Sequence, residues 1–340
     1  MVSFDEVQKL KEFLSSPKKI VITTHHKPDG DALGSSLAML RFLTRTGHQA
    51  FLVTPTDYPK FLEWLPGNDL VQIWTEQKEI CTKLLQNADA VFCFDFNVLK
   101  RINEMGEVIS KLNCLKVLVD HHPEPSDFPD ISYWSTLACS TCELVYDLMI
   151  QLDAGNYLDA ETATCLYTGI MTDTDNFHLP NTTGKVHRIV ADLMERGVNA
   201  GECYRQIFET YSVNRLRFFG ECMKEKIEFY DDIKAGIMCL DKDDLSKYGI
   251  TTGDTEGLVN LPLKVEGILL SALIVRRPDM VKLSLRSRGD FDVNKICREH
   301  FNGGGHKNAA GGNSDVGVAE TKIKLLSILA PLKNLILQNS

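Results

Sequence analysis

The sequence predicts an α/β protein in which a mostly parallel-sheet domain is joined by a helical connector to a smaller α/β domain. Three observations carry this prediction. Strand-like and helical patterns alternate from residue 19 to about 197, charged helical patterns without a strand follow, and strand-like runs resume from about 227. A length of 340 residues also suits two cores better than one. We therefore expect a first domain at 1–198, a connector at 199–226 and a second domain at 227–340.

In the first domain, short runs of apolar and β-branched residues predict buried strands. These runs are 21–24, 50–54, 90–95 and 115–120. Helical periodicity predicts helices at 32–46, 140–151, 159–171 and 184–196. Alternation of this kind is typical of parallel strands that helices cover on both faces. Residues 140–143, Ser-Thr-Cys-Glu, also fit a capping box that opens one of these helices.

The second domain shows a shorter series of the same patterns. Strand-like runs lie at 236–240, 267–275 and 280–285, and a helix is expected at 294–301. A glycine-rich stretch follows at 303–312, and a last helix is expected near 320–335. A bare glycine run more often forms a flexible turn than a binding loop.

Composition and charge exclude several classes of protein. No apolar run approaches the about 18 residues that a membrane span needs, so we expect no membrane partner. The amphipathic N-terminal pattern is no signal peptide, and ten cysteines without a secretory signal favour a cytoplasmic protein with reduced thiols. The net charge of −9 argues against a protein that coats long nucleic acid.

The most informative stretch is 21–36, VITTHHKPDGDALGSS. His25, Asp29 and Asp31 lie between the first predicted strand and the helix after it, on a turn that contains proline and glycine. In open α/β sheets this end of a strand borders the ligand crevice. One imidazole and two carboxylates there form a plausible site for a divalent cation. Helix capping by an aspartate would explain only one of the two carboxylates.

Three further polar clusters end strands or helices of the first domain. They are Asp95, then Asp120 with His121 and His122, then Asp173 with Asp175. Any one of them is an ordinary end of an element, but four in one domain are harder to dismiss. Together they offer imidazole and carboxylate ligands without cysteine, which suits Mn²⁺ or Mg²⁺ better than structural zinc.

These motifs resemble, in order and approximate spacing, the DHH phosphoesterase superfamily. The matching residues are His25-x-x-Pro28-Asp29-Gly30-Asp31-Ala32, Asp95, Asp120-His121-His122 and Asp173. The second domain resembles the DHH-associated domain, through SLRSR at 284–288 and GGGHKNAAGG at 303–312. The chain looks closest to the NrnA-type oligoribonucleases, which also hydrolyse 3′-phosphoadenosine 5′-phosphate.

The resemblance implies a cofactor of two divalent cations, Mn²⁺ in the first place and Mg²⁺ or Co²⁺ as alternatives. One cation would be held by His25, Asp29 and Asp95, and the other by Asp31, Asp95, His121 and Asp173. Such a pair can clamp a phosphoryl oxygen for in-line displacement. The implied catalytic residues are His122, which faces the scissile phosphate, and Asp120, which orients an imidazole.

The second domain is expected to bind the substrate. By resemblance the binding residues are Arg286, Ser287, Gly304, Gly305, His306 and Asn308. Glycines let backbone N–H groups approach an anion, and arginine is suited to forked phosphate recognition. Residues 276–307 contain eight Lys or Arg against four acids, a local excess of four positive charges on an acidic chain.

The chain departs from the family pattern at two positions. Phe96 follows Asp95 where relatives often carry a small polar residue, and Asp175 replaces the glycine of the fourth motif. A carboxylate at 175 could accept a hydrogen bond outside the metal ligands, or disfavour a polyanionic substrate. These departures leave the expected metal site intact and make the substrate preference less certain.

The resulting hypothesis is a metal-dependent phosphodiesterase whose partner is a short oligonucleotide or phosphorylated nucleotide. An inorganic pyrophosphatase or exopolyphosphatase would share the metal motifs, but the glycine-rich second domain argues against it. A RecJ-like exonuclease on long single strands is disfavoured by chain length and acidity, and a non-catalytic RNA-binding module would be expected to lack ligands. A homodimer is compatible with the resemblance.

Overall fold

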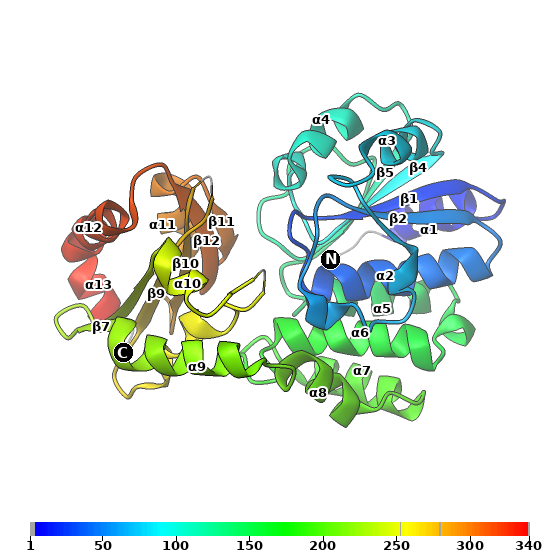
Figure 1. The fold of residues 1–340 in the computed structure, drawn as a ribbon. Helices are drawn as coiled ribbons and strands as arrows, with labels where there is room; N and C mark the ends of the chain where they lie inside the picture. The colour runs from blue at the N-terminus through cyan, green and yellow to red at the C-terminus, as the bar shows by residue number, and fades with distance from the viewer. Residues whose placement is uncertain (1–3, 252, 279, 339–340) are drawn as a thin grey trace. The chain divides into compact units, whose positions relative to one another are not determined.

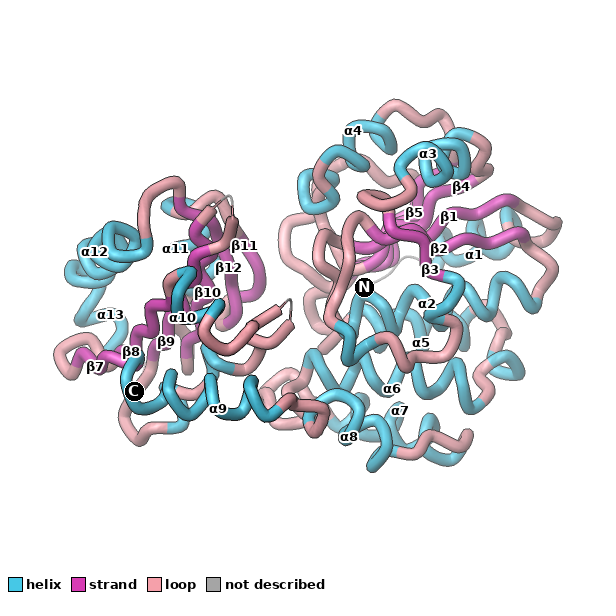
Figure 2. Tube along the Cα trace, viewed as in Figure 1, coloured by secondary structure: helices cyan, strands magenta, loops and turns pink. Residues whose placement is uncertain are grey.

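The computed structural model describes residues 4–251, 253–278 and 280–338. The chain divides into two units, Met1–Thr210 and Tyr211–Ser340, each with its own sheet (Figures 1 and 2). The division falls within the range 199–226 that the sequence assigns to a connector. The predicted α/β class is confirmed, with a parallel sheet in the first unit and a mixed sheet in the second. Within the described ranges no helix combines the length and the apolar character needed to cross a membrane.

The first unit contains a six-stranded sheet in the order β3-β2-β1-β4-β5-β6, with all neighbours parallel. Its strands are β1 Lys19–Thr24, β2 Gln49–Thr54, β3 Val71–Ile73, β4 Ala90–Phe94, β5 Leu115–Asp120 and β6 Ile131–Trp134. Its helices are α1 Phe4–Phe13, α2 Gly30–Arg45, α3 Lys78–Gln86, α4 Glu104–Ser110, α5 Thr141–Gln151, α6 Ala160–Asp173, α7 Gly184–Glu195 and α8 Ala200–Phe208.

Helices cover both faces of this sheet because side chains alternate between the faces along each buried strand. In β1, Ile20 and Ile22 join the core formed with α2, α5 and α6. Val21, between them, joins the core formed with α3 and α4 on the other face. Figure 1 shows α3 and α4 on one side of the strands and α2, α5 and α6 on the other.

Four elements of this unit were not predicted from the sequence, namely β3, β6, α3 and α4. The two strands have only three and four residues, too few for a clear alternating pattern. The predicted strand 90–95 ends one residue early, because Asp95 has a left-handed backbone with φ 64° and leaves the extended conformation. The predicted helix 32–46 begins earlier, at Gly30, because Asp29 caps it.

The second unit has the strand order β11-β12-β10-β9-β8-β7, in which only β8 and β9 are parallel neighbours among the described strands. The strands are β7 Ile227–Tyr230, β8 Ala235–Leu240, β9 Leu270–Arg276, β10 Val281–Ser287, β11 Gly304–His306 and β12 Ala309–Ser314. The helices are α9 Val213–Glu221, α10 Lys242–Ser246, α11 Val293–His300, α12 Val318–Leu329 and α13 Lys333–Leu337.

One pair of strands in this unit was not predicted, and one expectation was wrong. The glycine-rich stretch 303–312, for which the sequence analysis expected no strand, forms most of the antiparallel pair β11 and β12. The single helix expected near 320–335 is two helices, α12 and α13, separated by a short 3₁₀ turn that contains Pro331. Proline cannot donate the backbone hydrogen bond that would continue α12.

Candidate metal centre

The predicted ligands gather at the point where successive strands change from being added on one side of β1 to being added on the other. From β1 the chain continues to β2 on one side, while β4 pairs with β1 on the other. His25 follows the end of β1, Asp95 follows β4, and Asp120 ends β5, so all three lie at the carboxyl edge of adjacent parallel strands. Such a switch point leaves a crevice at the sheet edge, which is where open α/β sheets bind ligands.

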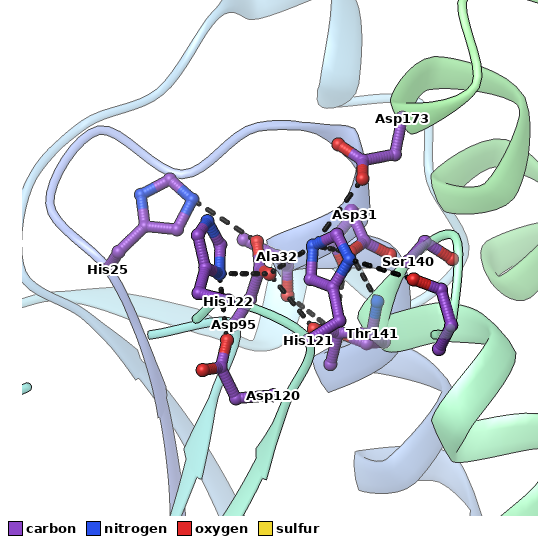
Figure 3. A network of polar contacts seen from close by, with 12 residues as sticks. His25, Asp31, Ala32, Asp95, Asp120, His121, His122, Ser140, Thr141 and Asp173 are labelled. Atoms are coloured by element: carbon purple, nitrogen blue, oxygen red, sulfur yellow. Dashed lines mark hydrogen bonds and ion pairs between the residues drawn. The ribbon is translucent and has the colours of Figure 1, made fainter. Parts of the chain in front are cut away.

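Asp95 lies between two groups of ligand atoms (Figure 3). Its Oδ2 is 3.3 Å from His25 Nε2, which is also 3.7 Å from Asp29 Oδ2. Its Oδ1 is 3.5 Å from His121 Nε2. The structure therefore brings together the first set of residues that the sequence analysis proposed for one cation.

The second set surrounds His121. Its Nε2 is 3.7 Å from Asp31 Oδ2 and 3.4 Å from Asp173 Oδ2. Asp31, His121 and Asp173 each place one ligand atom within 4.8 Å of the others, as do His25, Asp29 and Asp95. Six side chains from four separate segments of the chain thus form two adjoining clusters of the kind that hold divalent cations.

The two carboxylate oxygens of Asp29, on the turn before α2, have different neighbours. Its Oδ1 accepts hydrogen bonds from the backbone N–H groups of Asp31 and Ala32, both at 3.1 Å, and so caps the helix. Its other oxygen, Oδ2, faces His25. Capping and ligation were alternatives for this carboxylate in the sequence; the structure shows that Oδ1 caps the helix while Oδ2 stays available on the side of His25.

Asp120 and His122 form a buried pair beside these clusters. Nδ1 of His122 is 2.8 Å from Asp120 Oδ1. The backbone carbonyl of His122 accepts a 2.6 Å hydrogen bond from Trp134 Nε1. Asp120 is fully buried, and its second oxygen has no hydrogen-bond partner among the described residues. The contact fixes the orientation of the imidazole of His122, which also approaches Asp95 Oδ1 at 3.6 Å.

The N-terminus of α5 holds the two central carboxylates. Asp31 accepts hydrogen bonds from the backbone N–H groups of Thr141, at 2.6 Å, and Cys142, at 2.8 Å. The hydroxyl of Thr141 donates to Asp95 Oδ1 at 2.9 Å. The first N–H groups of a helix have no partner within the helix and lie at its positive end, so they suit a carboxylate. Sequence reasoning missed this role of Thr141, although the capping motif around it marked the helix start.

That helix start is fixed by a variant of the predicted capping box. Ser140 Oγ accepts from the backbone N–H of Glu143 at 3.1 Å, as expected. The carboxylate of Glu143, however, accepts from the N–H of Cys139 at 2.7 Å, one residue before the position that a capping box uses. Its other oxygen accepts a 2.7 Å hydrogen bond from Lys185 on α7. Glu143 therefore joins the start of α5 to a neighbouring helix.

Close packing of α2 against α6 brings Asp173 near Asp31. A Cβ on Gly30 would lie 2.4 Å from the hydroxyl oxygen of Thr172, and one on Gly34 would lie 2.4 Å from the carbonyl oxygen of Cys165. Both distances are shorter than any real carbon contact. The two helices can approach this closely only because α2 carries glycines four residues apart on the face toward α6.

Burial and crowded charge shift the ionisation of the cluster. Burial would lower the pKa of His25, but the neighbouring carboxylates Asp29 and Asp95 outweigh it and raise that pKa to about 10. Burial and the charge of Asp95 raise the pKa of Asp31 to about 7. The same two causes raise the pKa of Asp120 to about 7. Bound divalent cations would relieve this repulsion, so the donor set fits them.

The residues expected to bind substrate lie in the second unit, around β10, β11 and β12. Ser287 Oγ donates to the carbonyl of Phe291 at 2.6 Å, and Asn308 Nδ2 donates to Ser287 Oγ at 2.9 Å. These two side chains therefore fix the turn that follows β10. Arg286 and His306 are half-buried, and both pair with Ala309 in the sheet register.

The glycines of this region differ in their surroundings. Gly305 has φ 146° and its backbone packs closely on β12, whereas a Cβ on Gly304 would make only ordinary van der Waals contacts, at 3.6 Å from Asn294 and 3.8 Å from Arg298.

The two departures from the family pattern have different surroundings. Phe96 is fully buried in the core with α3 and α4 and stacks on Phe128, with ring centroids 6.2 Å apart. Asp175 is exposed and has φ 48°, and the two residues after it are also left-handed. Glycine adopts that conformation most readily, and aspartate is among the few other residues that tolerate it.

Comparison with known proteins assigns the chain to a family. The model described as DHH family, N-terminal domain, matches residues 19–170, and the DHHA1 domain matches residues 235–330. The bifunctional oligoribonuclease and PAP phosphatase NrnA of Thermus thermophilus is 31% identical over 86% of this chain and 83% of its own length. The enzyme of the same description from Bacillus subtilis is 27% identical over 86% of this chain and 88% of its own length.

A solved structure covers nearly the whole chain. The crystal structure of an exopolyphosphatase-related protein from Bacteroides fragilis matches with a TM-score of 0.93 and 34% identity, over 99% of this chain and 98% of that one. The chain belongs to the DHH family and is a hydrolase of that family. The predicted family is therefore confirmed.

Proposed function

We propose that this protein is a two-metal phosphodiesterase that hydrolyses very short oligoribonucleotides to mononucleotides and also removes a phosphate from 3′-phosphoadenosine 5′-phosphate. One observation carries the proposal, namely the convergence of two imidazoles and three carboxylates around the carboxylate of Asp95 at the switch point of the first sheet. The relatives from Thermus thermophilus and Bacillus subtilis, which match most of the chain, are oligoribonucleases and PAP phosphatases.

The proposed ligands divide between the two oxygens of Asp95. His25, Asp29 and Asp95 would hold one cation, and Asp31, Asp95, His121 and Asp173 would hold the other. Mn²⁺ is the expected ion, because the donors are oxygen and imidazole nitrogen without thiolate. When bound, such a pair lowers the pKa of a bound water and neutralises charge on a phosphoryl group.

The protein's own groups would position the reacting atoms. Asp120 accepts a hydrogen bond from Nδ1 of His122 and so orients this imidazole, which would act on a phosphate oxygen or a leaving group. Thr141 holds Asp95, and the start of α5 holds Asp31, so both carboxylates are oriented before a substrate binds. Preorganisation of this kind avoids reorganisation during the reaction.

A preference for short substrates follows from the charge of the chain. A protein with a net charge of −9 gains little by neutralising successive phosphates of a long strand. The local excess of basic residues at 276–307 is confined to one part of the second unit and suits one or two phosphates. Substrate length is therefore expected to add little affinity beyond a few nucleotides.

The proposal is tested with purified protein and Mn²⁺ on four substrates in parallel: a ribodinucleotide, a 24-mer RNA, 3′-phosphoadenosine 5′-phosphate and pyrophosphate. We expect kcat/KM to be highest on the dinucleotide, lower on 3′-phosphoadenosine 5′-phosphate, and to fall steeply for the 24-mer. Equal or better turnover of the 24-mer would instead favour a RecJ-like exonuclease. Pyrophosphate as the best substrate would favour a pyrophosphatase.

A further inference from the structure

The glycine-rich pair of strands contains glycines that its own packing requires. A Cβ on Gly303 would lie 1.9 Å from the carbonyl oxygen of Gly311. A Cβ on Gly305 would lie 2.5 Å from the carbonyl oxygen of Ala309, and the φ of this residue, 146°, also disfavours a side chain. No side chain can be added at either position unless the backbone moves. These two glycines are explained by the fold alone.

Gly304, between them, is different. The atoms nearest to its missing Cβ are Oδ1 of Asn294 at 3.6 Å and Cγ of Arg298 at 3.8 Å, which are ordinary van der Waals distances. Its φ is not in the left-handed region, so an alanine methyl group would fit here without strain. Glycine in a strand is unfavourable unless a close approach needs it. The packing of the fold therefore does not require glycine at 304, and the missing methyl group leaves a small space beside Asn294 and Arg298.

Asn294 presents an unsatisfied acceptor to this space. It is the second residue of α11 and only 9% exposed, and its Oδ1 has no hydrogen-bond partner within the described parts of the chain. Buried polar atoms are nearly always hydrogen-bonded, so an exception calls for an explanation. Because Oδ1 is 3.6 Å from the position that a Cβ of Gly304 would take, it faces the unfilled space.

The sheet register connects this space with the expected phosphate-binding side chains. His306 and Arg286 both pair with Ala309, and Gly304 precedes His306 by two residues. Side chains that are paired across strands, or two apart along a strand, point to the same face. Gly304 therefore shares a face with Arg286 and His306, next to α11, which packs beside β11 (Figure 1).

We infer that Asn294 is a specificity-determining residue whose Oδ1 accepts a hydrogen bond from a nucleotide, and that Gly304 leaves room for this group. The inference rests on the proposed function. An amide oxygen is an acceptor and so is a phosphate oxygen, which excludes the phosphate itself as the partner. The partner is an N–H or O–H group, either a ribose hydroxyl or the exocyclic amine of a base.

Three dinucleotides distinguish these two sources. They are an adenine ribodinucleotide, its 2′-deoxy counterpart, and a ribodinucleotide of purine without the 6-amino group. For the wild-type protein, we expect kcat/KM to be about tenfold or more higher on the adenine ribodinucleotide than on one of the two analogues. A site built around a hydrogen bond rejects the analogue that lacks the hydrogen-bonding group. In Asn294→Leu this preference should fall to near unity. The analogue that the wild type rejects identifies the donor.

A matched pair of glycine variants tests the space itself. Gly304→Ala should fold normally and raise KM for the preferred dinucleotide, because the added methyl group occupies the space beside Asn294. Gly303→Ala should lower the melting temperature, because its methyl group meets the backbone of β12. A Gly304→Ala protein with the wild-type KM would contradict the inference, whatever the stability of Asn294→Leu.

The result for the wild type separates this inference from the proposed function. If the wild type cleaves none of the dinucleotides, the proposed function is wrong and the inference falls with it. If it cleaves all three equally, or keeps its preference in Asn294→Leu, only the inference is wrong.

Discussion

The hydroxyl of Thr141 donates a 2.9 Å hydrogen bond to Oδ1 of Asp95, across 46 residues of sequence and in a buried environment. This is the same oxygen that lies 3.5 Å from His121. The contact helps to fix the orientation of a carboxylate that His25 and His121 also approach. It makes the start of α5 part of the candidate metal centre.

Removal of this hydroxyl should weaken metal binding without a loss of fold. Thr141→Val keeps the shape of the side chain, and we expect the affinity for Mn²⁺ to fall by about tenfold to a hundredfold, as for other residues that orient metal ligands. Titration with Mn²⁺ followed by calorimetry measures the affinity. Thr141→Ser retains the donor and serves as the control. Wild-type affinity in the valine variant would show that the hydrogen bond is incidental.

Replacement of the central carboxylate should abolish metal binding and activity together. Asp95→Asn preserves the shape of the side chain and tolerates the left-handed backbone, but it removes the negative charge shared by both clusters. We expect almost no bound Mn²⁺ and almost no turnover, with an unchanged circular dichroism spectrum. Asp69→Asn changes an exposed aspartate outside the clusters and should match the wild type. A metal-loaded, active Asp95→Asn would refute the bridging role.

Metal affinity should rise with pH. In the metal-free protein the pKa of Asp31 is about 7 and that of His25 is about 10, so both groups carry protons that a cation must displace. The apparent affinity for Mn²⁺ should therefore increase from about pH 6 to about pH 8, with proton release. Calorimetry in buffers of different ionisation enthalpy measures that release. An affinity independent of pH would contradict the assignment of these groups as ligands.

The same shifts predict how the stability of the metal-free protein depends on pH. The folded protein binds the Asp31 proton more tightly than the unfolded chain, whose reference pKa is 3.8. This stabilisation is fully present below pH 3.8 and is lost as the pH rises through about 7. The raised pKa of His25 acts in the same direction above 6.5. The melting temperature of the metal-free protein should fall from about pH 6 to about pH 8, and saturating Mn²⁺ should offset the fall.

The close packing of α2 on α6 predicts an asymmetry between two glycine substitutions. Gly34→Ala places a methyl group 2.4 Å from the carbonyl oxygen of Cys165 and should destabilise the protein by about 1–3 kcal/mol. Gly220 lies in α9 with nothing within 4 Å of its missing Cβ. Gly220→Ala should therefore stabilise the protein by about 0.5–1 kcal/mol. Urea unfolding of both variants measures the difference, and a neutral Gly34→Ala would contradict the packing argument.

The sequence was sufficient to predict the features that local patterns encode. The parallel first sheet and the family followed from strand runs that end in His25, Asp95 and Asp120, because strand, turn and ligand are adjacent in the chain. The edge strand β3 has three residues and was not predicted, because so short a run has no measurable period.

Features that depend on distant segments could not be predicted in this way. Thr141 is 46 residues from Asp95 in sequence, and its neighbours suggested only a helix cap. The pairing of β11 with β12 was missed because local glycine content predicts a turn. The extended conformation of β12 is instead stabilised by its antiparallel pairing with β10. In both cases the deciding contact is a tertiary one.

The left-handed backbone at Asp95, with φ 64°, limits the ways in which this position can change during evolution. Only glycine, asparagine and aspartate adopt this conformation readily, so a β-branched residue would disturb the turn after β4 as well as the charge. Descendants that lose catalysis but keep the fold should therefore carry Asn or Gly at this position. Within the family, an Asn or Gly here would mark a chain that has kept its architecture after losing its chemistry.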